Sequence, residues 1–87
     1  MGPKQKQLLA VSRTLMPQGV AENYRDWGAD KTVFVQSAKG CELTDCDGKT
    51  YVDFRLGYGP IILGYQDPRV DAAVIQQIQS GGTLTGF

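Results

Sequence analysis

The sequence predicts an α+β fragment in which an N-terminal helix, a three-stranded antiparallel meander, a glycine-rich loop and a C-terminal helix follow one another. Three observations lead to this class. Apolar residues recur at helical spacing near both ends of the 87-residue chain. Apolar and polar residues alternate in the middle, between turn signals. The connection before the last helix is rich in glycine, apolar and aromatic residues, whereas most connections are short and polar.

The first predicted element is a helix over residues 4–16. Leu8, Val11 and Leu15 recur at i, i+3 and i+7, with Leu9 and Met16 alongside, so one face of this helix is apolar. Pro17 ends the helix because its ring cannot continue the hydrogen-bond ladder. Since only one face is apolar, we expect the helix to dock on other protein.

The second predicted unit is a three-strand meander over residues 32–54. Alternation places Cys41 and Leu43 on one face of the middle strand. Asp47 followed by Gly48 is a strong turn signal, since glycine adopts positive φ at no steric cost. The expected order is a strand at 33–37, a turn at 38–40, a strand at 41–45, a turn at 45–49 and a strand at 50–54.

The last predicted elements are a loop over residues 55–66 and a helix over residues 67–82. Asp67 is expected to cap the helix and Pro68 to occupy its first position. Val70, Val74 and Ile78 form an apolar stripe at i, i+4 and i+8. The elements together expose more apolar surface than so short a chain can bury, so we expect the loop to pack against further protein.

Composition excludes several classes of function. Nine basic and nine acidic residues give a net charge of zero, so capture of nucleic acid or an anionic membrane is not indicated. No apolar run approaches the length of a bilayer span, and the N-terminus has no continuous signal region. A soluble cytoplasmic protein is therefore expected.

The two cysteines predict neither a disulfide nor a metal site. Cys41 and Cys46 are five positions apart, and in an extended strand this spacing places them on opposite faces and too far apart to bond. The chain contains no histidine, so zinc would lack ligands. We expect two reduced packing cysteines and no metal.

A few residues are candidates for a binding site. Arg25 lies in an irregular stretch between aromatic residues, where a guanidinium suits bidentate recognition of a carboxylate, although a solvated surface arginine is the alternative. Tyr58 stands between two glycines, so its ring either lines a pocket or packs in the ordinary way. Asp53 either faces solvent in its strand or pairs with Arg55 or another basic group. A phosphate cradle around Gly57–Pro60 is disfavoured because Pro60 lacks an N–H group.

The order of these segments resembles the N-terminal region of class III pyridoxal-phosphate (PLP) aminotransferases, most closely the glutamate-1-semialdehyde aminomutase branch. The segments that carry the resemblance are MPQGVAENYR, VFVQSAKGCELTDCDGKTYVDF and GYGPIILGYQDPRV. It implies that the fragment is part of a fold-type I PLP-dependent transferase. It also implies that residues 55–66 line the cofactor cleft near a dimer interface, which explains an apolar, glycine-rich connection.

The resemblance also assigns roles residue by residue. Arg25 matches an arginine that reaches the substrate carboxylate, and Tyr58 stands where an aromatic residue packs on the substrate. The pocket loop is shaped by Gly57, Gly59 and Pro60, while Gly82 and Thr83 match a segment at the subunit interface. Three positions depart from the family pattern: Gln18 replaces a glycine, Tyr65 a histidine and Glu22 a serine. The change at Glu22 favours transamination of another amino acid over semialdehyde isomerisation.

The catalytic parts that the resemblance implies do not match any residue of this chain. The family's Schiff-base lysine, its pyridine-binding aspartate and its phosphate site are expected downstream of Phe87. We therefore expect the chain to be a truncation, a cleaved piece or an engineered fragment, to contain no catalytic residue and to bind PLP weakly by itself. The leading hypothesis is the N-terminal part of a homodimeric PLP-dependent aminotransferase that moves an amino group between an amino acid and an oxo acid or aldehyde. The alternatives are the aminomutase reaction and a non-catalytic, self-associating interaction module.

Overall fold

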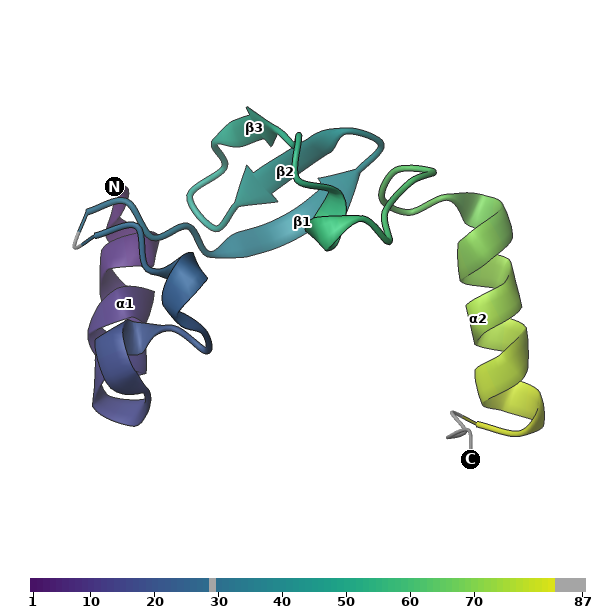
Figure 1. Ribbon diagram of the computed structural model, residues 1–87, viewed down its shortest axis with the longest axis horizontal. Coiled ribbons are helices and arrows are strands. Elements are labelled where there is room, and N and C mark those ends of the chain that lie inside the picture. Colours follow the sequence, from purple (N-terminus) through teal and green to yellow (C-terminus); the bar gives the residue numbers. More distant parts are fainter. Residues whose placement is uncertain (29, 83–87) are drawn as a thin grey trace.

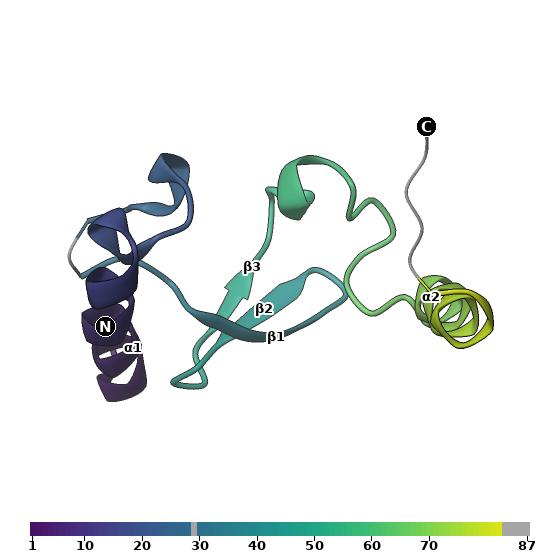
Figure 2. The ribbon, with the colours of Figure 1, turned by 90° about the horizontal axis from the view of Figure 1, so that it is seen from below.

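The computed structural model describes residues 1–28 and 30–82, which form an open arch (Figure 1). Helix α1 (Pro3–Leu15) lies at one end, a three-stranded sheet lies in the middle, and helix α2 (Pro68–Ser80) extends from the other end. A second view confirms that the two helices flank the sheet on opposite sides (Figure 2). The radius of gyration is 15.7 Å, whereas a compact domain of this length would have about 12 Å. The α+β class and the element order are as predicted.

Helix α1 begins at Pro3, which suits the first helical turn, and ends two residues before Pro17. Of the predicted apolar face, only Leu9 is buried. Gln5, Leu9 and Ser12 are the buried residues of the helix, whereas the stripe that contains Leu8 remains exposed. Leu9 is 3 % exposed and is the one buried large apolar side chain among the described residues. The chain therefore has almost no hydrophobic core of its own.

The sheet has the order β1–β2–β3, and both pairings are antiparallel. The strands are β1 (Val35–Lys39), β2 (Glu42–Asp45) and β3 (Thr50–Val52). The meander is confirmed, but the first strand begins two residues later than predicted. The N–H group of Phe34 donates to the side chain of Gln5 at 2.8 Å rather than to a strand. An irregularity in register between Val35 and Ser37 then shifts the pairing, so the turn falls at Gly40 and Cys41 instead of 38–40.

The Asp45–Lys49 turn holds helix α1 against the sheet. Asp45 is 1 % exposed, and its carboxylate accepts the N–H groups of Asp47 at 2.9 Å and Lys49 at 3.0 Å, which stabilises the turn. Asp47 in turn accepts the N–H groups of Lys4 and Gln5, both at 3.0 Å, and so caps α1 from a distant part of the chain. The two aspartates thus stabilise the turn and also position the first helix.

The buried carboxylate of Asp45 is fully hydrogen-bonded. It also accepts from Tyr51 Oη at 2.8 Å and from Gln5 Nε2 at 3.1 Å. Burial by itself raises the pKa of Asp45, but the hydrogen bonds from Tyr51 and from the backbone of Lys49 and Asp47 outweigh it and lower the pKa below its ordinary value. A charged group is stable in this buried place because every donor around it points at the carboxylate.

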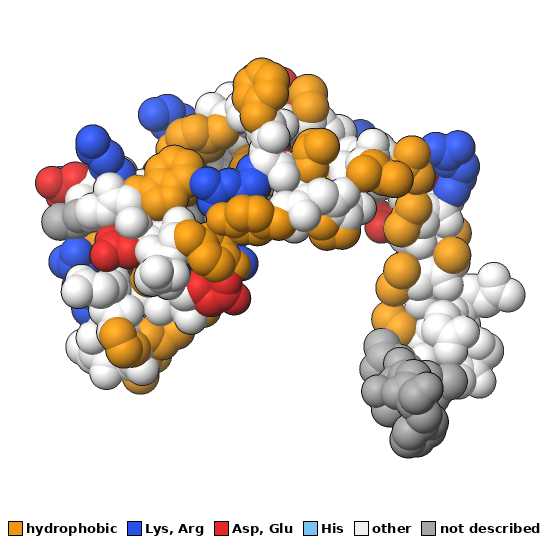
Figure 3. Space-filling view, in the orientation of Figure 1, with side chains coloured by type: hydrophobic (Ala, Val, Ile, Leu, Met, Phe, Trp, Pro, Cys, Tyr) orange, Lys and Arg blue, Asp and Glu red, His pale blue; other side chains and the backbone are white. Residues whose placement is uncertain are grey.

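Helix α2 is capped as the sequence predicts. The Asp67 carboxylate accepts the N–H groups of Arg69 at 2.9 Å and of Val70 at 3.4 Å, and Pro68 occupies the first position. The predicted apolar stripe along this helix is exposed: Val70, Val74 and Ile78 retain between 46 % and 55 % of their accessible surface. The space-filling view shows a row of hydrophobic side chains along the inner edge of α2 (Figure 3).

The total accessible surface of the chain shows how open the arch is. The accessible surface of the chain is 6881 Å², whereas a compact protein of 9.5 kDa exposes about 5,000 Å². The arch therefore presents far more surface than a self-sufficient domain of its mass. This agrees with the expectation that its faces are built to be covered by further protein.

Candidate functional site

The glycine-rich loop makes a left-handed turn directly after β3. Leu56, Gly57, Tyr58 and Gly59 have φ values of 57°, 61°, 64° and 114° in succession. Glycine adopts this region freely, but Leu56 and Tyr58 each do so at a cost of about 1 kcal/mol. Tyr58 N–H donates to the Arg55 carbonyl at 3.1 Å and Gly59 N–H to the Leu56 carbonyl at 3.0 Å, which closes the turn. The strained backbone leaves the Tyr58 side chain 60 % exposed.

Asp53 organises the entry to this turn. Its carboxylate accepts the N–H groups of Arg55 at 2.8 Å and of Leu56 at 3.2 Å, together with the hydroxyl of Tyr65 at 2.7 Å. These bonds turn the chain away from the sheet, so β3 ends at Val52 rather than at Phe54 as predicted. The hydrogen bond from Tyr65, followed by that from the Arg55 backbone, lowers the pKa of Asp53. The same bond raises the pKa of Tyr65.

The loop is tied to the sheet at its far end. Gly40 and Tyr65 exchange two backbone hydrogen bonds of 2.9 Å. A Cβ atom on Gly64 would lie 3.0 Å from the carbonyl oxygen of Gly40, so only glycine permits this approach. Tyr65 therefore anchors the loop through both its backbone and its hydroxyl group.

The backbone amides of the turn cannot form a phosphate cradle. Asp53 already occupies the N–H groups of Arg55 and Leu56, which form the concave pair that would otherwise hold an anion. The N–H groups of Tyr58 and Gly59 are used inside the turn, and Pro60 has none. The sequence likewise disfavours a phosphate site at this turn, because Pro60 lacks an N–H group.

Aromatic side chains from two distant segments meet at Tyr58. The ring of Tyr24, which lies in the short 3-10 turn Asn23–Arg25, meets the ring of Tyr58 edge-on, with centroids 5.0 Å apart and planes at 80°. Trp27 Nε1–H donates to the carbonyl of Tyr24 at 3.1 Å, which fixes the indole beside this turn. The loop and the irregular segment before the sheet thus share one aromatic wall.

Two arginines lie on this wall. The guanidinium of Arg25 is 5.2 Å from the ring centroid of Tyr24. The guanidinium of Arg55 lies 4.9 Å from the ring of Tyr58 and 5.5 Å from that of Trp27. We call these five residues the arginine–aromatic cluster; its members are Tyr24, Arg25, Trp27, Arg55 and Tyr58. Figure 3 shows basic side chains lying directly against hydrophobic ones on the face between α1 and the sheet.

The cluster contains both residues that were predicted from the sequence to bind substrate, Arg25 and Tyr58. Tyr24 is the bridge, because it contacts both Arg25 and Tyr58. Sequence reasoning missed Tyr24, Trp27 and Arg55 as members of the site. The pairing of Asp53 with Arg55 does not form as a close ion pair: the carboxylate accepts from Tyr65 and from backbone N–H groups, and the charge of Arg55 makes only a minor contribution to its lowered pKa. The aromatic residues around Arg25 were the one available signal, and nothing local links them to position 58.

The remaining predicted site residues fall into three groups. Gly57, Gly59 and Pro60 shape the turn that carries Tyr58. Gly82 is half-buried, and its carbonyl oxygen accepts a hydrogen bond from the Gln77 side chain at 2.9 Å. Thr83 lies outside the described residues.

Both cysteines are free, as expected, but Cys41 is exposed at the turn rather than packed, because the register shift moves the turn onto it. Burial, followed by the charges of Asp47 and Asp45, raises the pKa of the Cys46 thiol, so it is a poor nucleophile at neutral pH. No group of three metal-ligating side chains occurs in residues 1–28 and 30–82.

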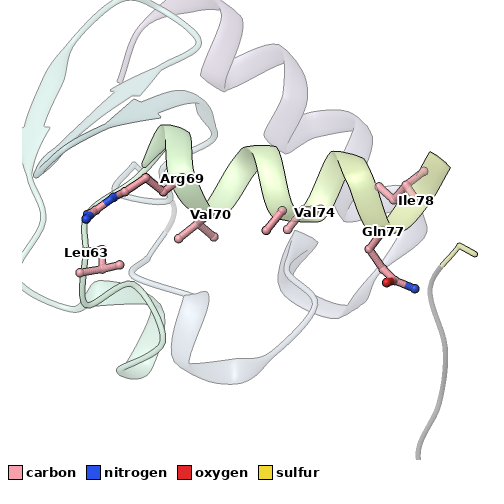
Figure 4. Close-up of a pocket in the computed structure, with 7 residues that line it drawn as sticks. Leu63, Arg69, Val70, Val74, Gln77 and Ile78 are labelled. Atoms are coloured by element: carbon pink, nitrogen blue, oxygen red, sulfur yellow. The ribbon is translucent and has the colours of Figure 1, made fainter. Parts of the chain in front are cut away.

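A second surface feature is an open groove along α2. It is lined by Leu63, Arg69, Val70, Ala73, Val74, Gln77 and Ile78, and Figure 4 shows these side chains along one flank of the helix. The lining is mainly aliphatic, and the one charged residue, Arg69, is engaged with Asp67 at 2.8 Å. The groove lacks the convergent polar groups of a small-molecule site. Within the described ranges, no helix has the length and apolar character needed to span a membrane.

Comparison with known proteins identifies the class to which this fold and cluster belong. The profile of the aminotransferase class-III family matches residues 24–86. The chain therefore belongs to the class-III aminotransferase family. The matched residues include the whole sheet, the loop with Tyr58, and helix α2.

Individual relatives are similar over nearly all of the chain. It is 42 % identical over 76 residues to the glutamate-1-semialdehyde 2,1-aminomutase of Thermoplasma volcanium, which covers 87 % of this chain and 18 % of the relative. The β-phenylalanine aminotransferase of Variovorax paradoxus superposes with a TM-score of 0.84 at 27 % identity, over 99 % of this chain and 20 % of that one. The FumI protein of Sphingopyxis sp. MTA144, solved in its PLP internal aldimine form, gives a TM-score of 0.82 at 31 % identity, over 98 % and 21 %.

The chain spans about a fifth of the length of the relatives that it matches. Its fold agrees with the corresponding part of those structures, which supports the predicted membership of the PLP-dependent transferases. The amides of the glycine-rich turn are already occupied, so this turn does not supply a site for the phosphate of a cofactor. The arginine–aromatic cluster of this chain is an exposed surface of aromatic rings that carries two guanidinium groups.

Proposed function

We propose that this chain forms the substrate-side wall of a PLP-dependent aminotransferase. The enzyme moves an amino group between an amino acid and an oxo acid or aldehyde. The observation that carries the proposal is the contact between Tyr24 and Tyr58, which places Arg25 and the glycine-rich turn on one surface. Family membership supplies the reaction class, and the cluster supplies the means of recognising a substrate.

In this proposal Arg25 binds the substrate carboxylate. Its planar fork of N–H donors matches the two carboxylate oxygens, and Tyr24 holds the guanidinium from one side. Tyr58 packs its ring against the carbon chain of the substrate. Gly57, Gly59 and Pro60 hold that ring in place through the left-handed turn. Together these residues orient the amino group and exclude water from one side of the site.

The cofactor of the enzyme is PLP, which acts as an electron sink when the amino group is transferred. Because the amides of the turn are occupied, we assign the cofactor's phosphate and its lysine to residues outside this chain. We predict that the isolated chain binds PLP weakly or not at all.

We further propose a homodimer in which Gly82 and Thr83 lie near the subunit interface. The exposed stripe of α2 supports this, since faces of this kind are covered in stable assemblies. The two free thiols suit a reducing compartment, and we propose the cytoplasm.

The aminomutase reaction is a second candidate, favoured by the 42 % identity to the Thermoplasma volcanium enzyme. Glu22 weighs against it. This residue stands directly before the Asn23–Arg25 turn, and its carbonyl oxygen accepts the N–H group of Arg25 at 3.0 Å. A carboxylate in place of the family's serine changes the charge beside the substrate. Assaying the full-length protein with amino donors and with glutamate-1-semialdehyde separates the two reactions.

The experiment that tests the proposal is substrate kinetics of Arg25→Lys in the full-length holoenzyme. Lysine keeps the charge but loses the bidentate fork, so we expect KM for a carboxylate substrate to rise about 10-fold or more, with a smaller change in kcat. Arg13→Lys is the matched control, because Arg13 is an exposed arginine in the last turn of α1. Unchanged kinetics in Arg25→Lys, or no amino transfer by the unmutated protein, would contradict the proposal. The second result would favour a non-catalytic interaction module.

A further inference from the structure

The second arginine of the cluster has a role that the family resemblance does not supply. We propose that Arg55 selects substrates that carry a second carboxylate, so that the enzyme accepts dicarboxylic amino acids or oxo acids of up to about six carbons. This inference rests on the proposed function, because it assigns the substrate class of the same site. Arg55 is thus a specificity-determining residue, distinct from Arg25.

The geometry prepares Arg55 to bind an anion. Its guanidinium carbon lies over the rings of Tyr58 and Trp27, 4.9 Å and 5.5 Å from their centroids. Its side-chain N–H groups donate no hydrogen bond to another described residue, so they remain available to an anion. The contacts also restrict the side chain's rotamers before a ligand arrives. A preorganised arginine loses less entropy on binding than a freely rotating one.

Both arginines of the cluster lack a carboxylate partner in the described part of the chain. The ion pair found there joins Arg69 to Asp67 on α2. Asp53 is the acidic residue nearest to Arg55 in the sequence, and its oxygens accept from Tyr65 and from the backbone of the turn. Two unpaired cations on one aromatic wall are an arrangement that a ligand with two negative charges completes.

The separation between the two guanidinium groups limits the length of that ligand. From Arg25 to Arg55 the contacts run through Tyr24 and Tyr58 in three steps of 5.2, 5.0 and 4.9 Å, so the two guanidinium carbons are at most about 15 Å apart. A bidentate guanidinium–carboxylate pair takes roughly 4 Å between its two carbons. At most about 7 Å then remains between the two carboxylates, which at ~1.5 Å per bond limits the ligand to a chain of up to about six carbons.

A purely supporting role for Arg55 makes a different prediction. If its guanidinium serves only to hold Tyr58 and Trp27, then its loss weakens the wall for every substrate alike. If it binds the second carboxylate, the loss is confined to dicarboxylates. The ratio between a dicarboxylate and a monocarboxylate of equal length therefore distinguishes the two roles.

The test measures binding of glutarate and of pentanoate to the full-length holoenzyme by calorimetry, together with kcat/KM for a dicarboxylic and a monocarboxylic amino donor. The variants are Arg55→Gln, which removes the charge, and Arg55→Lys, which keeps charge and fold but loses the fork. Arg13→Gln is the matched control. We expect Arg55→Gln to weaken glutarate binding about 10- to 100-fold and pentanoate binding by less than about 2-fold, with Arg55→Lys in between.

Equal losses for both ligands, or no loss for either, in a folded Arg55 variant would overturn the inference. Calorimetry keeps this outcome separate from failure of the proposed function. A protein that binds glutarate through Arg55 but transfers no amino group would refute the aminotransferase proposal and leave the dicarboxylate site standing. An active transaminase whose preference for dicarboxylates is unchanged in the Arg55 variants would support the aminotransferase proposal and refute the dicarboxylate site.

Discussion

The Gln5 side chain provides a direct test of how helix α1 is held on the sheet. Gln5 is 5 % exposed, its Oε1 accepts the Phe34 N–H group at 2.8 Å, and its Nε2 donates to Asp45 Oδ2 at 3.1 Å. Gln5→Leu keeps a side chain of similar size and removes both bonds. The change leaves the Phe34 N–H group without its partner, in a place where water has limited access.

The magnitude follows from this loss. An unsatisfied, partly buried backbone donor costs about 1–3 kcal/mol. The carboxylate of Asp45 keeps its bonds from Tyr51 and the turn, so its contribution to the loss is small. We therefore expect the contact between α1 and the sheet to weaken by about 2 kcal/mol, which is roughly a 30-fold change in its opening equilibrium.

The assay is amide hydrogen exchange followed by mass spectrometry on peptides that contain Phe34. In Gln5→Leu, exchange of this amide is expected to accelerate roughly 30-fold, while peptides from α2 stay unchanged. Gln7→Leu is the control, because Gln7 lies on the same helix with an exposed side chain. Equal exchange at Phe34 in the unmutated protein and Gln5→Leu would refute the reasoning, since the bond would then hold nothing in place.

Two further predictions concern the loop. Because the pKa of Asp53 is lowered in the folded state, this carboxylate stabilises the fold above the ordinary carboxyl pKa of about 4, and the stabilisation is lost as pH falls through the lowered value. Tyr65→Phe removes a hydrogen bond to the carboxylate, so it should raise the Asp53 pKa and move acid unfolding of the loop to higher pH. Carboxyl NMR measures both changes. Because the pKa of Tyr65 is raised, its contribution is present below about pH 10 and is lost as pH rises through the raised value. Gly64→Ala places a Cβ atom 3.0 Å from the Gly40 carbonyl oxygen, so in thermal denaturation it should cost about 1–3 kcal/mol more than Gly28→Ala, whose φ is also positive but whose Cβ would meet no atom within 4 Å. Equal costs of the two substitutions would contradict this explanation.

The structure also explains why the connection between sheet and helix is apolar and aromatic. Tyr58 and its neighbours lie on an open wall shared with the segment before the sheet, and they are not sealed within a core. The surface that remains open is far larger than a compact protein of this mass would have. The connection thus contributes its side chains to an exposed surface rather than to a core of this chain.

The sequence predicted the structural features that depend on residues close together in the chain. The cap at Asp67, the turn at Asp47 and Gly48, and the end of the first helix before Pro17 all involve residues within a few positions of one another. Interactions of this range leave a pattern in the sequence, because the residue types themselves satisfy or forbid nearby hydrogen bonds. The element order and the approximate boundaries follow from such signals.

The tertiary structure decided the register of the first strand, the buried face of α1 and the membership of the cluster. Gln5 reaches Phe34 across 29 positions and Asp45 across 40, and these bonds bury the polar Gln5–Leu9–Ser12 face instead of the apolar stripe. Arg55 meets Trp27, and Tyr24 meets Tyr58, only once the chain has folded back. The physical reason is that a contact between distant positions depends on where the backbone brings them, and no local periodicity records it.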